Sequence, residues 1–191
     1  MLNLMKYIYL FILLISCSLT SSCAYHNEYP SSWSPLNSSP QGDCTNISGK
    51  FMDKGEFGGC SEYKASLSHK LFGHLVYKMN ITLNEATHVL FSQNNNEKIK
   101  VTVLKNDKEI YSKLFEKTQN QFECEEGFVK IPINVFLNMD GVLAKEWITL
   151  YLVKSEDYLT IKSKNSTVGM MFFIPAVATS TSWLRFKQIH N

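Results

Sequence analysis

Alternation of apolar and polar residues dominates the chain from residue 75 onward. In the segment 98–103, Ile99, Val101 and Val103 alternate with polar residues, and this period of two is typical of a strand with one buried face. Polar turn sequences such as Asn106-Asp107 separate segments of this kind. Further strands are predicted within 109–115, 129–133, 147–153, 158–162, 168–174 and 183–186. The pattern therefore predicts an antiparallel meander of about seven strands.

Some predicted strands are apolar on both faces, notably 147–153 and 168–174. Such strands need cover on both sides, so the sequence predicts a mainly β fold with one packed amphipathic helix. The sheet is expected to be curved or to close into a small lipocalin-like barrel, because closure would protect its edges. Pro132 interrupts the alternation of 129–133 and predicts an edge or a strand end there. Turns are expected at 138–141, 155–157 and 164–166.

The helix is predicted over residues 61–73. Tyr63, Leu67 and Leu71 follow one another at steps of four residues, which places them on one face of a helix. Ser61 is a suitable N-terminal cap, and Gly73 is a suitable residue at which the helix ends.

The N-terminus begins with a positive charge, Lys6, followed by the apolar run 7–15. A charged residue, a short apolar core and small residues form the pattern of a secretory signal peptide. The run is shorter than the roughly 20 apolar residues that a membrane-spanning helix needs. Residues 1–22 are therefore predicted to be an export signal.

The segment 19–23 reads Leu-Thr-Ser-Ser-Cys. It resembles the lipobox of bacterial lipoproteins, and this resemblance implies that Cys23 is acylated and becomes the first residue of the mature chain. Cys17 follows a second acceptable sequence, but its apolar core would be shorter. Ala24 stands where an Asp would favour retention at the inner membrane. By resemblance to Gram-negative lipoproteins, the expected location is the cell envelope, anchored by lipid, with the outer membrane as the destination.

Residues 23–43 are rich in serine and contain three prolines, which prevent helix and discourage strand pairing. They are predicted to form a tether, followed by a single β-rich domain over 44–191. Trp33 is unusual in a spacer. It is expected to lie back against the domain, or alternatively to contact a partner or the membrane interface.

After Cys23, the body contains three cysteines. An exported, oxidising location favours disulfides, and three cysteines allow one bridge and leave one thiol over. Cys44 opens the expected ordered region and Cys124 precedes a predicted strand. We therefore predict a Cys44–Cys124 disulfide, with Cys60 as the remaining thiol.

The opening 44–51 reads Cys-Thr-Asn-Ile-Ser-Gly-Lys-Phe, and the chain closes with Trp-Leu-Arg-Phe at 183–186. Together with Trp33 and Pro35 upstream and Leu71-Phe72 in the middle, this arrangement is similar to a group of uncharacterised Gram-negative lipoproteins. The resemblance implies an envelope location and supports the proposed disulfide. It implies no particular activity.

Composition and motifs exclude several classes of function. The net charge is +2 and the basic residues are dispersed, whereas nucleic acid requires a concentrated basic surface. No phosphate-binding loop or dinucleotide fingerprint is present, so no cofactor is expected. His69, His74 and His88 lack the spacing of zinc ligands. Ser61 and Lys64 have the Ser-x-x-Lys spacing of penicillin-recognising enzymes without its companion motifs.

These observations favour a lipid-anchored binding or scaffold module without catalysis. Its partner would be another envelope protein, or an apolar ligand in a cavity lined by Ile148, Leu150, Val168 and Met170. One alternative is an envelope hydrolase whose site forms only in the fold, from residues such as Ser61, His69 and His88. The other is a eukaryotic secreted glycoprotein, because Asn-x-Ser/Thr sequons begin at Asn37, Asn46, Asn80 and Asn165.

Overall fold

The computed structural model describes residues 28–36, 44–58, 60–76, 82–139, 142–155, 157–171 and 174–190, without the side chains of 60–63, 137–139, 142, 171 and 174. The predicted signal peptide 1–22, Cys17 and Cys23 lie outside these ranges. So do residues 23–27 and 37–43 of the predicted tether.

The described residues form a mainly β fold with one antiparallel sheet and a single short α-helix. The strands in chain order are β1 (Gly49–Met52), β2 (Lys54–Phe57), β3 (Cys60–Ser66), β4 (His88–Asn94), β5 (Lys98–Lys105), β6 (Lys108–Glu116), β7 (Glu123–Glu125), β8 (Phe128–Met139), β9 (Val142–Lys154), β10 (Tyr158–Met171) and β11 (Ile174–Ile189). Their order in the sheet is β6-β5-β4-β1-β11-β10-β9-β8-β7, and the β2–β3 hairpin pairs with β11 beside this path. The predicted antiparallel curved sheet is therefore confirmed.

The prediction that the sheet closes into a lipocalin-like barrel is wrong. The ends of the sheet are β6 and β7, and they do not pair with each other in the part of the chain that the structure describes. The strands also differ greatly in length. β8 to β11 contain 12 to 16 residues, whereas β1 and β4 to β6 contain 4 to 9. The long strands therefore extend past every partner that could close a barrel.

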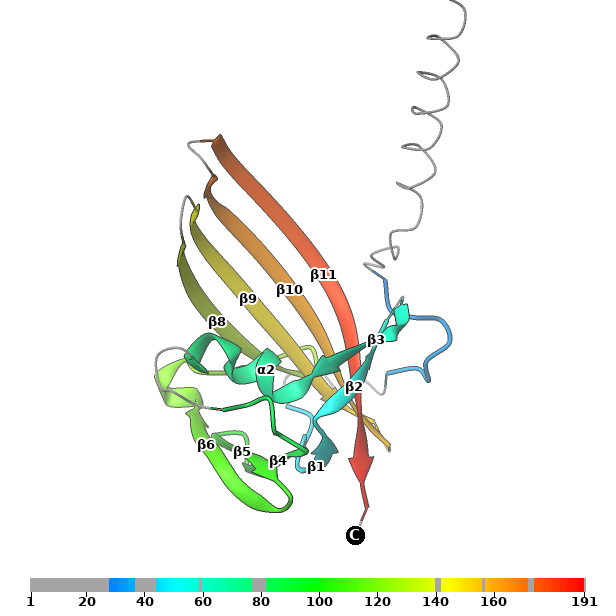
Figure 1. The fold of residues 1–191 in the computed structure, drawn as a ribbon. Helices are drawn as coiled ribbons and strands as arrows, with labels where there is room; N and C mark the ends of the chain where they lie inside the picture. The colour runs from blue at the N-terminus through cyan, green and yellow to red at the C-terminus, as the bar shows by residue number, and fades with distance from the viewer. Residues whose placement is uncertain are drawn as a thin grey trace, which may run out of the picture.

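Figure 1 shows this extension as four long strands that leave the body of the molecule. One row of directly opposite residues crosses the four long strands. It consists of Pro132 of β8, Thr149 of β9, Lys164 of β10 and Thr181 of β11. We define the arm as the part of β8–β11 from this row to the ends of the two hairpins. Strands β4 to β6 bend round at the other end of the sheet, and α2 (Leu67–Phe72) lies between them and the base of the long strands (Figure 1).

The hydrophobic core fills the space between α2, the bent strands and the base of the long strands. Its largest fully buried side chains are Phe51, Phe72, Phe91, Phe122, Phe186, Ile47, Leu67, Leu71, Leu83, Ile99, Ile131 and Leu150. Even the short β7 contacts this core, through Cys124. At about 1.5–3 kcal/mol for each buried large side chain, this cluster is the main stabilising contribution.

The predicted helix 61–73 is only half correct. Residues 60–66 form strand β3, and the helix begins at Leu67 with Ser66, not Ser61, as its N-cap. Pairing with β2 explains the difference, because Ala65 lies opposite Gly55 in the hairpin. The same residues fit a period of two as well as a period of four, and tertiary pairing decided between them. Gly73 is the C-cap as predicted, and short 3₁₀ turns follow at Gly73–Leu75 and later at Lys117–Gln119.

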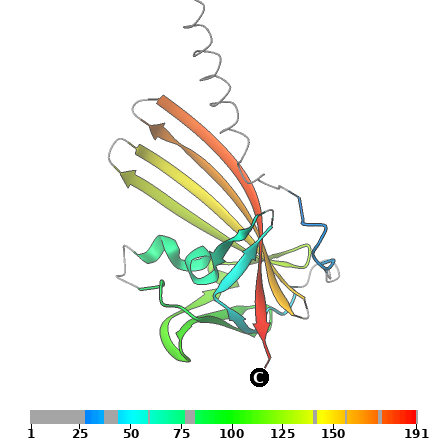
Figure 2. The same cartoon turned by 45° about the vertical axis from the view of Figure 1, so that its right-hand side comes forward.

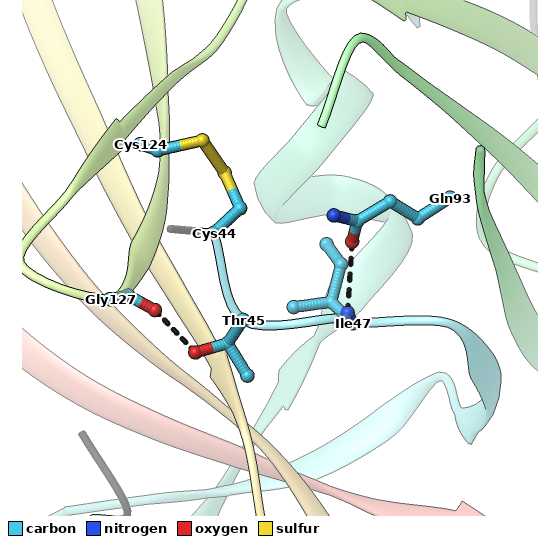
Figure 3. Close-up of a disulfide and its surroundings, with 6 residues drawn as sticks. All are labelled: Cys44, Thr45, Ile47, Gln93, Cys124 and Gly127. Carbon is cyan, nitrogen blue, oxygen red and sulfur yellow. Dashed lines mark hydrogen bonds between the residues drawn. A yellow bond between two sulfur atoms is a disulfide. The ribbon is translucent and has the colours of Figure 1, made fainter. Parts of the chain in front are cut away.

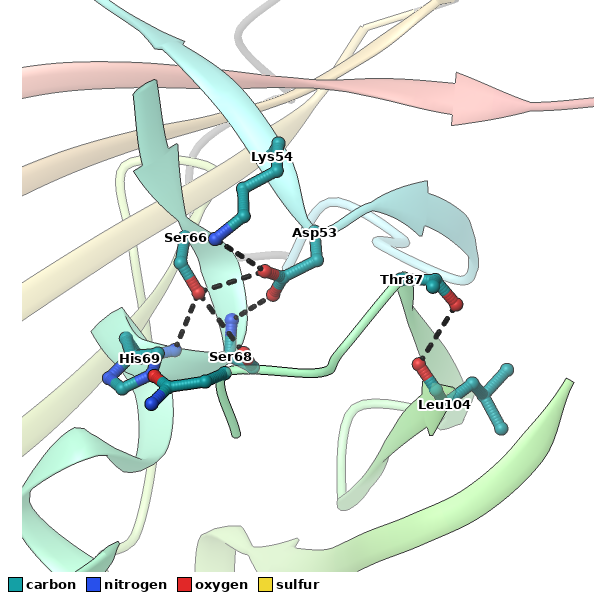
Figure 4. Close-up of polar contacts among 8 residues, drawn as sticks. Asp53, Lys54, Ser66, Ser68, His69, Thr87 and Leu104 are labelled. Carbon is teal, nitrogen blue, oxygen red and sulfur yellow. Dashed lines mark hydrogen bonds and ion pairs between the residues drawn. The ribbon is translucent and has the colours of Figure 1, made fainter. Parts of the chain in front are cut away.

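A buried carboxylate holds the start of this helix in place (Figure 4). Asp53 has no exposed surface, and it accepts hydrogen bonds from the Ser68 backbone N–H at 2.8 Å and the Ser66 hydroxyl at 2.9 Å. The Ser66 hydroxyl in turn accepts from the His69 N–H at 3.3 Å. These bonds satisfy N–H groups that the first turn of a helix leaves without partners.

Two expectations about turns have opposite outcomes. Asn106 and Asp107 form the tight turn between β5 and β6, with φ of 48° and 65°, as a two-residue hairpin turn requires. The predicted turn at 164–166 is wrong, because β10 runs through it and pairs with β9 on one side and β11 on the other. Pro132 lies where β8 has passed the end of β7, so its missing N–H costs nothing on that open edge.

The N-terminal segment 28–36 packs against the base of the sheet, as predicted for Trp33. The Tyr29 ring meets Trp183 edge to face at 5.0 Å between centroids. The Arg185 guanidinium lies 4.7 Å from the centroid of the Trp33 ring. In Figures 1 and 2 the segment, in blue, lies on the side of β11 away from α2. This part of the predicted tether is therefore bound to the domain.

The predicted disulfide joins Cys44 to Cys124, with 4.9 Å between the Cα atoms and a sequence separation of 80 (Figure 3). The adjacent backbone is held on both sides. Thr45 donates from its N–H and its hydroxyl to the Gly127 carbonyl, and the Ile47 N–H donates to the Gln93 side chain at 3.0 Å. The bridge thus attaches the start of the domain to the β7–β8 hairpin.

Candidate functional site

Register assigns the side chains of the long strands to two faces, because residues directly opposite in an antiparallel pair point the same way. One face carries Val129, Leu150, Ile161 and Leu184, which are buried in the core below α2. We call this the inner face and the opposite one the outer face. On the arm, the outer face consists of four rows that run across the strands. The rows are Pro132, Thr149, Lys164 and Thr181; Asn134, Trp147, Ser166 and Thr179; Phe136, Lys145, Val168 and Val177; and Leu143, Met170 and Pro175.

Exposed large apolar side chains gather at the end of this outer face. Of the eight such side chains among the described residues, six belong to these rows. They are Phe136 (69% exposed), Val177 (73%), Leu143 (47%), Met170 (46%), Val168 (45%) and Trp147 (39%). Contiguous exposed apolar surface of this kind marks an interaction site in soluble proteins. The inner face of the arm differs, because it presents the small residues Ala144, Gly169, Ala176 and Ala178.

Next to the apolar end, the outer face is hollowed into a shallow groove of about 340 Å³. Hydroxyl groups from three strands line it, together with the ring of Trp147 and the ammonium group of Lys164. The hydroxyl-bearing residues of the outer face are Thr149, Ser166, Thr179 and Thr181. The groove therefore offers polar contacts directly beside the apolar rows.

Lysines and aromatic rings alternate toward the base of the outer face. The ammonium group of Lys145 lies 4.9 Å from the Trp147 ring centroid, and that of Lys164 lies 5.0 Å from the Tyr151 ring centroid. Lys162 makes the same contact with Trp183 at 5.1 Å. A cation over an aromatic face is attracted by the ring quadrupole. None of these three lysines has an anionic partner in an ion pair among the described residues.

The charge of the outer face has one sign. On β8–β11 its described residues include six cationic side chains and no carboxylate; the cations are Lys130, Lys145, Lys162, Lys164, Arg185 and Lys187. Two of them are neutralised from neighbouring strands. Lys130 pairs with Glu123 and Glu125 of β7, whose hydrogen bonds raise the pKa of its ammonium group, and Arg185 pairs with Glu56 at 2.6 Å. The three lysines that face the aromatic rings give the outer face a net positive charge.

A second hollow, of about 470 Å³, lies on the inner side between the long strands and the β3–α2 segment. Its lining is mixed in charge. The charged or titratable members are Lys64, His69, Lys70 and Glu146, and the others include Ile148, Ser163 and Asn165. No apolar ligand chamber corresponds to this hollow.

The predicted apolar ligand lining is wrong, because its four residues are split between the two faces. Ile148 lies opposite Asn165, and Leu150 lies opposite Ser163, on the inner face. Leu150 is fully buried in the core, and only Ile148 reaches the inner hollow. Val168 and Met170 lie on the outer face and are almost half exposed.

Other residues with possible chemistry are separated in the structure. His69 Nε2 lies 2.9 Å from the Asn84 side-chain oxygen, and His88 Nδ1 lies 3.0 Å from the Thr87 hydroxyl. Ser61 and Cys60 belong to the first part of β3, residues 60–63, whose side chains are not described. Within the described ranges, no group of three or more His, Cys, Asp or Glu side chains could hold a metal ion.

The sequence alone does not predict the apolar surface of the outer face, because assigning side chains to the two faces requires the register of the strands. The predicted strand 168–174 is divided between β10, which ends at Met171, and β11, which begins at Ile174. Its apolar sequence predicts cover from within the domain, but Val168 and Met170 are exposed. Lys145 is likewise distant in sequence from Lys162 and Lys164, and the three lysines share a face only through the pairing of β9 with β10.

None of the helices in the described part of the chain has both the length and the apolar composition needed to cross a membrane. No protein-family model matches the chain, and comparisons with curated proteins and with solved structures found no match.

Proposed function

We propose that this chain is a lipid-anchored protein of the bacterial cell envelope that acts by binding, and that the outer face of the arm is its binding surface. The observation that carries the binding surface is the set of six exposed large apolar side chains on one face of an arm that extends from the core. Leaving these side chains in water is unfavourable by about 25 cal/mol for each Å² of apolar surface, so covering them favours association.

The anchor is supported by the N-terminal sequence, with its short apolar run and a lipobox-like segment ending at Cys23. Acylation of Cys23 would place the domain permanently at a membrane. The disulfide between Cys44 and Cys124 agrees with an exported location, because structural disulfides persist in oxidising compartments.

Site-directed photocrosslinking in the native host tests the binding surface. A photoreactive amino acid replaces Leu143 at the end of the outer face or, as the control, Leu114 on β6. Both leucines are 47% exposed, so the two probes differ in place and not in accessibility. We expect a specific adduct from position 143 and none from position 114. Equal yields at the two positions would refute the binding surface.

The intact mass of the protein extracted from host membranes tests the anchor separately. The expected mass is that of residues 23–191 with acyl groups and one disulfide. A mass without acyl groups would refute the lipid anchor and leave the crosslinking result to decide the binding surface.

A further inference from the structure

We infer that the outer face of the arm docks onto the surface of an anionic lipid bilayer, which makes the arm a second membrane contact beside the lipid anchor. This inference rests on the proposed function, since it names what the proposed binding surface binds. Three independent observations on the outer face support it: the order of residue types along the strands, the sign of the charge and the position of the N-terminal segment.

The order of residue types matches the polarity gradient of a membrane interface. The outermost two rows are apolar apart from Lys145, and the next row contains Trp147 among hydroxyl-bearing residues. Closer to the base come Tyr151 and Trp183, each with a lysine over its ring. Trp and Tyr are enriched at membrane interfaces, and lysine stems lie along apolar surface while the ammonium group stays in water.

The reach of the side chains fits shallow insertion. Amphipathic elements that lie on a membrane bury their apolar side chains about 5–10 Å into the headgroup and acyl boundary. Side chains such as Phe136 and Met170 that project from one face of a sheet can enter to about that depth without carrying the backbone into the hydrocarbon. The inner face, with Ala176 and Ala178, then stays toward water.

The charge selects the kind of surface. Lys145, Lys162 and Lys164 have no acidic partner in any described ion pair, and the carboxylates that β7 and β2 bring beside the outer face are paired with Lys130 and Arg185. A positive face of this kind is complementary to anionic lipid headgroups, and each lysine near such a surface contributes about fivefold to binding. A second copy of the chain would bring like charges together across the same face.

The N-terminal segment reaches the domain on this same face. Tyr29 packs on Trp183, whose side chain belongs to the outer face at its base, and Figure 2 shows the segment on the side of β11 away from α2. Trp183 and Val177 of β11 are six residue steps apart, a distance of about 20 Å along a strand. An anchor upstream of Glu28 and the apolar rows of the arm can therefore meet one membrane together.

Tryptophan quenching by brominated lipids tests docking on the protein as purified from its host. The chain has three tryptophans, and a Trp147→Phe variant identifies the signal that comes from the arm. The protein is added to phosphatidylcholine vesicles with or without phosphatidylglycerol, brominated on the acyl chains. We expect most of the Trp147 emission to be quenched in the anionic vesicles and little in the neutral ones.

Neighbouring substitutions on opposite faces provide the control. Val177→Glu places a carboxylate on the outer face and should abolish the quenching, whereas Ala178→Glu places the same group on the inner face and should leave it unchanged. A Lys145→Gln, Lys164→Gln variant should weaken docking by roughly 25-fold. It should therefore require a higher fraction of anionic lipid.

Each contrary outcome identifies which idea fails. Trp147 emission that stays unquenched on vesicle-bound protein, or that responds equally to Val177→Glu and Ala178→Glu, refutes docking onto lipid. A crosslink from position 143 to another protein or to a second copy also refutes it, while the proposed binding surface stands. Equal crosslinking from positions 143 and 114 refutes the binding surface itself.

Discussion

Removing the carboxylate of Asp53 should destabilise the domain more than any other single polar substitution in the described core. In Asp53→Ala, the Ser68 N–H and the Ser66 hydroxyl both lose a charged acceptor, at 2.8 and 2.9 Å. Hydrogen bonds to charged groups are worth about 1.5–3 kcal/mol each. The loss is reduced for Ser66, because its hydroxyl stays within 3.1 Å of the Ser68 hydroxyl. It is not reduced for the Ser68 N–H, which becomes a buried donor without a partner.

The expected cost of Asp53→Ala is therefore about 3–4 kcal/mol, a large share of the 5–15 kcal/mol that stabilises a typical domain. Asp53→Asn keeps the shape and one oxygen acceptor, so about half of that loss is expected. Urea unfolding followed by tryptophan fluorescence measures both, with the slope of the transition checked for constancy. Glu85→Ala is the control, since this carboxylate is 55% exposed and forms its ion pair with Lys105 at the surface.

The result that would refute this reasoning is a loss below about 1 kcal/mol for Asp53→Ala, or a loss equal to that of Glu85→Ala. Either would mean that water replaces the carboxylate without cost. A change in the slope of the transition would mean that the substitution alters the compactness of one state, and the free energies could then not be compared directly.

Two further predictions concern covalent and steric features. Replacing Cys44 and Cys124 together by Ala should lower the unfolding free energy by about 4.5 kcal/mol, because the bridge closes an 80-residue loop. Reversible denaturation measures this free energy. A loss below about 1 kcal/mol would contradict the prediction. Gly55→Ala should cost about 1–3 kcal/mol, because an added Cβ would overlap the Phe186 ring. At Gly73 the φ is −53°, and an added Cβ would have its nearest neighbour at 3.7 Å. Gly73→Ala should therefore raise the thermal midpoint of unfolding. Equal effects of the two glycine variants would contradict this account.

Local sequence was sufficient where one face of a strand is polar throughout. The alternation over 98–103 predicted β5, whose odd residues Ile99, Val101 and Val103 are fully buried. The disulfide could also be predicted, because three cysteines in a domain predicted to be exported leave few choices.

Local sequence failed where pairing between distant residues decides the conformation. Asn165 and Ser166 are typical turn residues, yet they lie inside β10 because β9 and β11 pair with it on both sides. Local sequence could not predict the position of the outer-face surface for the same reason. Even-numbered residues of β9 share a face with odd-numbered residues of β10, so Leu150 and Val168 point in opposite directions.

The docked segment 28–36 changes what the predicted tether can do. A free coil of twenty residues would let the domain move about 25 Å from its anchor. With Tyr29 and Trp33 held on β11, only five residue steps separate Cys23 from Glu28, a contour of at most about 18 Å. A short link of this kind confers an effective concentration in the millimolar range on the arm at the membrane surface. If Cys23 is acylated, an intrinsic dissociation constant of about 1 mM would therefore be enough to keep the arm on the bilayer for half of the time.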